Sequence, residues 1–387
     1  MDFIESDEHS MLREAVAQIG AKFGHEYYVS KAKSDQKSDE LWDAVGEAGF
    51  LGVGVPQAYG GGGMGIYELA IVEEELAAQG CPLLMIVVSP AICATVIAHF
   101  GTEAQKQKWL PGFASGELKM AFAITEPDAG SNSHKLSTTA TRDGDVYRLN
   151  GTKYYISGVD EADAILVVTR TGVDEESGKG KLSLFVVDVD SPGLDKSVIP
   201  VEITAPEKQF TLFFDNVQVP ADRLIGVEHD GLRQIFMGLN PERILSAALS
   251  SGVSRYALDK AANYARERKV WGIPIGAHQG ISHPLAKLKV EAELARLMMQ
   301  KAAWLFDNNG SPAEAGEAAN MAKYAAAEAA IACLDQAIQT HGGNGMSSEY
   351  GLMSYFGSAR LLRIAPVSRE MILNFVAQHS LGLPHSY

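Results

Sequence analysis

The sequence predicts an α+β protein in which two helical parts flank a β-rich middle part. Three observations support this class. Apolar residues recur at three- and four-residue intervals over roughly the first 115 residues, short β-rich runs follow from about 119 to 220, and three long helical patterns occupy the remainder. Strands and helices are grouped rather than alternating, which favours α+β over a βαβ arrangement.

Length, charge and cysteine content limit the possible classes of protein. The 387 residues suffice for two or three domains, and the formal net charge of −15 argues against nucleic acid or an anionic membrane surface as a partner. Three cysteines without metal-ligand spacing and an acidic N-terminus unlike a signal peptide predict a cytoplasmic protein with no metal site. The uncharged stretch 81–100 has the length of a membrane span, but Pro82 and Pro90 favour a buried helix pair.

The N-terminal part is expected to form helices at 3–23, 38–49, 66–79 and 90–99. Gly60, Gly62 and Gly65 formally match the G-x-G-x-x-G pattern of dinucleotide-binding folds. That function needs a strand leading directly into the glycines and βαβ units after them, whereas Pro56 interrupts the preceding run. We therefore expect a glycine-rich loop followed by a helix start.

The middle part contains five predicted strands, at 121–125, 146–156, 164–171, 182–189 and 210–219. A turn is expected at 142–145, and the dipeptide Asn150-Gly151 predicts a hairpin inside the second run, because both turn positions favour positive φ. The segment 121–133 passes from a strand into an acidic loop rich in small polar residues. Such a loop could bind the edge of a flat heterocycle or form an ordinary polar turn.

The C-terminal part is expected to contain long helices at about 241–267, 281–307 and 312–340, which can pack as a bundle. Asn240 and Pro241 have the residue types of a helix N-cap and first turn, which places Glu242 at a helix start. There the carboxylate could complement the helix dipole or act as a base at the mouth of a bundle pocket. Residues 339–345 predict a helix C-terminus, and Pro366 predicts a break between two helices.

Motifs that the sequence lacks exclude two enzyme classes, and motifs that it contains resemble those of a known family. Ser131 lacks the G-x-S-x-G pattern, and no H-E-x-x-H or Cys/His cluster occurs, which excludes serine hydrolases and zinc enzymes. Seven stretches, in order and spacing along essentially the whole chain, resemble the acyl-CoA dehydrogenase family of flavoproteins. They are PQAYGGGGMG (56–65), AFAITEPDAGS (121–131), LNGTKYYISG (149–158), FFDNVQVP (213–220), ARERKVWG (265–272), HQGIS (278–282) and QTHGGNG (339–345).

The resemblance implies an N-terminal helical domain (1–115), a middle antiparallel β domain (116–225) and a C-terminal four-helix bundle (226–387). It implies FAD at their junction and a homotetramer. The positions implied to face the flavin are Phe122, Thr125, Ser131, Tyr155, Ser157 and Ser368. Those implied to hold the pyrophosphate and adenine, usually across a subunit interface, are Arg268, Trp271 and Gln279, with Gln339 and Gly343 as the opposing contribution.

The implied reaction is α,β-dehydrogenation of an acyl-CoA to the trans-2-enoyl-CoA, with electrons passed to an electron-transfer flavoprotein. A carboxylate takes the α-proton while a hydride leaves Cβ for the flavin. Many members carry this base as a Glu on a C-terminal loop, where this chain has Pro366. Isovaleryl-CoA and long-chain members use a Glu directly before a helical Arg, which here implies Glu242 as the base and Ser131, Asn240 and Arg243 at the substrate.

Proline at position 366 leaves other functions open. A related flavin oxidase or monooxygenase would share these motifs, and a non-catalytic acyl-CoA- or flavin-binding scaffold would need no base. Pro366 also lacks the backbone N–H that helps to polarise the thioester carbonyl in the Glu-loop enzymes. For Glu242, desolvation would raise the carboxyl pKa, whereas Arg243 and a helix N-terminus would lower it. The residues in the acyl-cavity region are apolar: Leu84, Met85, Val87 and Val88.

Overall fold

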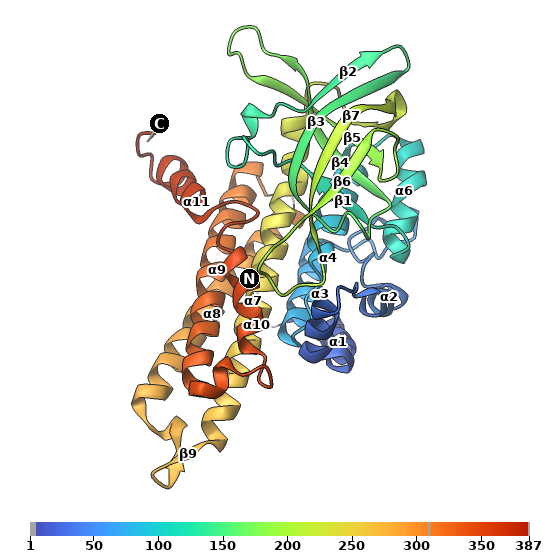
Figure 1. Cartoon of the computed structure of the whole chain (residues 1–387). Helices are drawn as coiled ribbons and strands as arrows, with labels where there is room; N and C mark the ends of the chain where they lie inside the picture. Colours follow the sequence, from blue (N-terminus) through green and yellow to red (C-terminus); the bar gives the residue numbers. More distant parts are fainter. Residues whose placement is uncertain (1–4, 309, 386–387) are drawn as a thin grey trace.

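The computed structural model describes residues 5–308 and 310–385, and its elements follow the predicted order of helices, sheet and helices (Figure 1). The predicted helix at 3–23 corresponds to α1, which begins after the N-cap Ser6; its first two predicted positions lie outside the described residues. The N-terminal helices are α1 (Asp7–Lys33), α2 (Asp39–Glu47), α3 (Ile66–Ala78), α4 (Leu84–Val88), α5 (Thr95–Phe100) and α6 (Glu103–Ser115).

The uncharged stretch 81–100 forms one continuous helical run instead of the expected pair. A π-helical segment, η2 (Ser89–Ala94), joins α4 directly to α5. The wide turn accommodates the ring of Pro90, which would clash inside a regular α-helix. Within 5–308 and 310–385, no helix combines the length and apolar character needed to cross a membrane.

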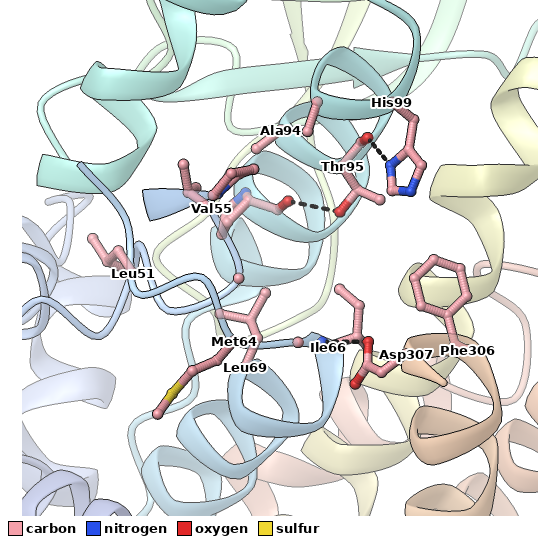
Figure 2. Close-up of a pocket in the computed structure, with 15 residues that line it drawn as sticks. Leu51, Val55, Met64, Ile66, Leu69, Ala94, Thr95, His99, Phe306 and Asp307 are labelled. Carbon is pink, nitrogen blue, oxygen red and sulfur yellow. Dashed lines mark hydrogen bonds between the residues drawn. The ribbon is translucent and has the colours of Figure 1, made fainter. Parts of the chain in front are cut away.

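The glycine-rich loop before α3 is confirmed as a loop and helix start. Asp307, the last residue of α8 (Gln279–Asp307), accepts a hydrogen bond from the backbone N–H of Ile66 at 2.9 Å (Figure 2). It accepts another from the Tyr67 N–H at 2.8 Å. A Cβ on Gly65 would lie 2.3 Å from Asp307 Oδ2, so only glycine permits this approach. The glycine spacing thus serves a helix cap supplied from a distant part of the chain.

Across the described residues, the middle part forms one eight-stranded sheet. The strand order is β6-β7-β3-β2-β4-β5-β8, and β1 pairs in parallel with β4, whereas most other pairs are antiparallel. The strands are β1 (Met120–Ala123), β2 (Thr139–Asp143), β3 (Val146–Ser157), β4 (Ala164–Val173), β5 (Gly180–Asp188), β6 (Leu194–Ile199), β7 (Gln209–Pro220) and β8 (Leu224–Ile225).

The predicted hairpin at Asn150-Gly151 is wrong. Both residues lie inside β3, and the tight turn is at 144–145 between β2 and β3, within the expected turn cluster. Gly151 has a φ of 147°, and a Cβ there would lie 2.6 Å from Thr138 Cα. Asn150 Oδ1 accepts a hydrogen bond from the Asn216 N–H at 2.9 Å. The pair forms a bulge in the β3–β7 register, so tertiary contacts override the local turn preference.

Three long helices dominate the C-terminal part: α7 (Gly231–Glu267), α8 and α9 (Pro312–His341). The short α10 (Leu352–Leu361) and α11 (Arg369–Phe375) follow, separated by the predicted break at Pro366. A small hairpin, β9 (Lys269–Val270) and β10 (Ile273–Pro274), joins α7 to α8 at the end of the helices farthest from the sheet (Figure 1). The predicted inner face of α8 is buried at Leu288, Ala292, Ala295, Met299 and Ala302, and Phe306 is half-buried.

The predicted helix start at Asn240 and Pro241 is also wrong, because α7 begins before these residues and continues through the proline. A proline inside a helix removes one backbone hydrogen bond, and tertiary packing holds the turns around it. A Cβ on Gly238 would lie 2.9 Å from Ile92 Cγ2, which shows how closely α7 crosses η2. Glu242 is therefore about three turns inside α7, beyond the influence of the helix N-terminus.

Candidate active site

Glu242 lies on α7, where the C-terminal helical part meets the N-terminal helices. Its side chain is half-buried, and burial raises the carboxyl pKa to about 7 against the lowering effects of Arg243 and Lys323. The carboxylate is also close enough to Cys93 on η2 to help raise the thiol pKa. Cys93 Sγ in turn contacts the Ala121 carbonyl oxygen at 3.6 Å, so η2 links the site to β1. A carboxylate that titrates near neutral pH suits a general base.

Two predicted substrate-binding residues lie within one turn of Glu242. Arg243 Nη1 donates a hydrogen bond to Asn240 Oδ1 at 2.9 Å, and the guanidinium lies 5.9 Å from the centre of the Phe236 ring. Arg243 Nε is buried and has no hydrogen-bond partner among the described residues. A buried, unpaired donor next to a candidate base is a position at which a polar ligand group could bind.

The turn that contains Pro366 is fastened to α9. Lys323, which is 1% exposed, donates from Nζ to the carbonyl oxygen of Val367 at 2.6 Å. Arg363 donates from Nε and Nη2 to the two carboxylate oxygens of Glu328 at 2.7 and 2.8 Å. This bidentate pair and the lysine hold the turn on both sides of the proline. Neither α9 residue was among the site residues predicted from the sequence.

Part of the group implied to face the flavin lies where the segment after β1 meets β3, inside the sheet. The Tyr154 N–H donates to the Thr125 carbonyl oxygen at 2.9 Å, which places the segment after β1 beside β3. Tyr155 has a φ of 56° and is 52% exposed, so its ring is available for stacking. Phe122 is buried in the core and can offer only backbone groups. The hydroxyl of Ser157 donates to Gln209 Oε1 at 3.0 Å.

A buried ion pair supports the loop that leads to Ser131. Lys153 Nζ donates to Glu126 Oε1 at 2.8 Å and to the Ile124 carbonyl oxygen at 2.9 Å. Burial would raise the Glu126 pKa, but Lys153 and donors at 137–138 lower it to about 2. Burial lowers the Lys153 pKa to about 8 in spite of the carboxylate. Ser131 itself is exposed on the loop, and Ser368 is the N-cap of α11, accepting a bond from the Met371 N–H.

The second implied group of FAD-binding residues lies at the opposite end of the molecule, around the β9–β10 hairpin (Figure 1). Trp271, between β9 and β10, is 88% exposed. The ring of His341 stacks on Tyr264 at 4.2 Å, which places the end of α9 beside the end of α7. The other members of the group are Arg268, Gln279, Gln339 and Gly343. One chain therefore does not bring the two groups together.

The residues expected near an acyl chain lie on α4. Met85 and Val87 are buried, while Leu84 and Val88 are half-buried. A Cβ on Gly158 would lie 2.3 Å from Met85 Sδ, so the end of β3 touches α4. The apolar side chains of α4 therefore pack against the end of β3.

A separate cavity of about 210 Å³ lies beside the glycine-rich loop (Figure 2). Val55 and Met64 line one side, Ala94 and His99 another, and Phe306 closes the end near α8. None of the predicted site residues lines it. The cavity is therefore a neighbouring feature and not the site built around Glu242.

Comparisons with known proteins agree with this architecture. Three family models match: acyl-CoA dehydrogenase N-terminal domain (residues 6–117), middle domain (121–217) and C-terminal domain (229–381). The acyl-CoA dehydrogenase FadE12 of Mycobacterium tuberculosis (strain ATCC 25618 / H37Rv) is 57% identical over 387 residues, covering 100% of this chain and 99% of its own. The long-chain specific acyl-CoA dehydrogenase, mitochondrial, of Sus scrofa is 30% identical, covering 97% and 87%.

Solved structures give the same result. The structure of butyryl-CoA dehydrogenase from Megasphaera elsdenii matches with a TM-score of 0.92 at 29% identity, covering 98% of this chain and 100% of that chain. The FAD complex of PigA matches with a TM-score of 0.89 at 27% identity, covering 99% and 100%. Both similarities extend over all three parts of the chain.

Proposed function

Because the chain belongs to the acyl-CoA dehydrogenase family of oxidoreductases, we propose that it dehydrogenates an acyl-CoA at Cα and Cβ with Glu242 as the base. The observation that carries this proposal is the half-buried carboxylate of Glu242 beside Arg243, with a pKa raised to about 7 by burial. The position of the base in Glu-loop members is Pro366, which cannot accept a proton. Glu242 followed by Arg243 fits the alternative placement.

The chain offers suitable groups for FAD, the cofactor of this family. Tyr155 presents an exposed ring, Thr125 offers a hydroxyl next to β3, and Ser131 offers one on the exposed loop that follows. Exposed Arg268 and Trp271 suit a diphosphate and an adenine ring. When bound, FAD would accept the hydride that leaves Cβ. The fit supports FAD as the cofactor of this chain.

The oligomer we propose is a homotetramer. The two groups of FAD-binding residues lie at opposite ends of one chain, so a second copy would have to supply the group around the β9–β10 hairpin (Figure 1). The outer face of α8 exposes Val290, Leu294 and Trp304 at helical spacing, which suits a contact between subunits. Light scattering of the purified protein tests this part, and a stable monomer that retains FAD would contradict it.

The chain's own residues would position the substrate and move the proton. Half-buried Leu84 and Val88 admit an apolar acyl group, while Asn240 and Arg243 lie within one turn of the base. Ionised Glu242 would take the α-proton onto a carboxylate oxygen. Since Pro366 has no N–H, the thioester carbonyl would depend on donors other than the backbone at this position.

Anaerobic mixing with acyl-CoAs of several chain lengths tests the reaction. We expect the absorbance of bound flavin to bleach with at least one chain length, and the absence of bleaching with every thioester would refute the proposal. Glu242→Gln should retain FAD and ligand but lose reduction by several orders of magnitude. Reoxidation by an electron-transfer flavoprotein, and only slowly by air, is expected of a dehydrogenase; fast reoxidation by air would indicate an oxidase.

A further inference from the structure

Lys323 is a buried cation between the candidate base and the Pro366 turn. Its side chain is 1% exposed, and one of its three donors is used on the Val367 carbonyl oxygen at 2.6 Å. A buried lysine is costly unless nearby groups compensate its charge. Its carbonyl partner is neutral, so the hydrogen bond alone does not explain why a full positive charge is placed here.

The packing of α9 against α7 shows where the Lys323 ammonium group lies relative to α7. A Cβ on Gly316 would lie 3.8 Å from the Asn240 side-chain amide, and the Cys333 thiol lies beside the Ser254 side chain. The two helices therefore run in the same direction with a nearly constant offset. With this offset, Lys323 lies opposite the turn of α7 that follows the candidate base.

We propose that Lys323 is a positioning residue for this base: its ammonium group favours the ionised form of Glu242, while its hydrogen bond to Val367 holds the Pro366 turn against α9. The inference rests on the proposed function, because it requires Glu242 to be the base. A lysine with only a structural role would fasten the turn and leave the ionisation of Glu242 unchanged.

The charges around Glu242 come from two helices. Burial raises the Glu242 pKa to about 7, and Arg243 on α7 and Lys323 on α9 both lower it. Cys93 on η2 also faces the carboxylate, but burial raises its thiol pKa well above the usual range, so it stays neutral. Without Lys323, only Arg243 would oppose the effect of burial, and the base would ionise at higher pH.

The surroundings of Lys323 keep it charged at neutral pH. Burial and Arg243 lower the Lys323 pKa to about 8, while Glu242, Glu328 and Glu370 oppose this lowering. The ammonium form therefore predominates at pH 7 and is lost as the pH rises through about 8. The lysine can support the ionised base over the pH range in which that base titrates.

Two substitutions in the FAD-bound protein separate the charge from the hydrogen bond. Lys323→Met removes both, whereas Lys323→Gln removes the charge and keeps an N–H donor for the Val367 carbonyl. Lys22→Met, at an exposed position on α1, is the matched control. The rate of flavin reduction by an acyl-CoA is measured anaerobically from about pH 5.5 to about pH 9. We expect the midpoint of the rate increase to move up by about one pH unit in both Lys323 variants, and to stay in place in the control.

A second measurement follows the ionisation of Glu242 without turnover. The difference in free energy of unfolding between Glu242→Gln and the parent protein is measured against pH, with Lys323 present and with Lys323→Gln. The midpoint of this pH dependence should move in the same direction as the midpoint of the flavin-reduction rate. If wild-type flavin is not reduced by any acyl-CoA, the proposed function is refuted. If wild-type flavin is reduced but the midpoints of the Lys323 variants coincide with the wild type, the role of Lys323 is refuted.

Discussion

The raised pKa of Glu242 predicts a specific pH dependence. A single carboxyl with a pKa of about 7 is about one-eleventh ionised at pH 6 and about ten-elevenths ionised at pH 8. Since only the ionised form can take the α-proton, kcat/KM should rise about tenfold across this interval. With the ordinary value of 4.5, the carboxyl would be almost fully ionised throughout, and the rate would be nearly constant.

Anaerobic stopped-flow measurements below saturating acyl-CoA report on the free enzyme and are the appropriate assay. Glu242→Gln should lack the pH-dependent component, and its residual rate serves as the baseline. A flat profile between pH 6 and pH 8 would refute the assignment of a raised pKa to the base. The same tenfold rise in Glu242→Gln would show that another group titrates.

The raised pKa of Glu242 also predicts how the free energy of unfolding changes with pH. The folded state holds the Glu242 proton more tightly than the unfolded state, so this contribution is fully present below pH 4.5 and is lost as the pH rises to about 7. The shift from 4.5 to about 7 corresponds to at most about 3 kcal/mol. Relative to the parent, Glu242→Gln should therefore gain stability across this range in urea denaturation, and a constant difference would contradict the shift.

Three further predictions concern the fold and the cofactor. Gly65→Ala would place a Cβ 2.3 Å from the capping carboxylate and should lower the free energy of unfolding by about 1–3 kcal/mol in urea, whereas Gly280→Ala, where no atom lies within 4 Å, should not. Lys153→Met leaves buried Glu126 without its partner and should cost about 3–5 kcal/mol, of which Glu126→Gln in the same chain should restore a part. Trp271→Ala should weaken FAD retention roughly tenfold in equilibrium dialysis with an unchanged far-UV spectrum, and undiminished retention would remove this residue from the site.

The helices of this fold could be predicted because their burial follows a simple period. The inner face of α8 was correctly expected from apolar spacing, and the end of α9 from its glycines. The strands β2 and β6 were missed, because most of their side chains are polar and exposed. They are strands because β3 and β7 supply hydrogen-bond partners, which the local sequence does not reveal.

Predictions from local sequence were wrong where contacts with another element determine the backbone conformation. Asn150-Gly151 is typical of a turn and Asn240-Pro241 of a helix start, yet β7 and Thr138 fix the first pair and the crossing with η2 fixes the second. The candidate base could be proposed from its resemblance to a known motif, but its pKa could not. That value depends on burial and on Lys323, which lies about 80 positions along the chain. The available signal was a lysine in an alanine-rich helix.

The proposed position of the base on α7 changes the requirements on the Pro366 turn. A base carried on a turn must be held in place by that turn, whereas Glu242 is held by a helix of 37 residues that packs on α3, α8 and α9. The turn therefore need not carry a carboxylate, although without an N–H at Pro366 the thioester carbonyl would need other donors. Its contacts with Glu328 through Arg363 and with Lys323 through Val367 fix the backbone of the turn on α9. Lys323 bonds to the turn and, in our proposal, favours the ionised form of Glu242. A change at this one side chain would therefore affect the position of the turn and the ionisation of the base together.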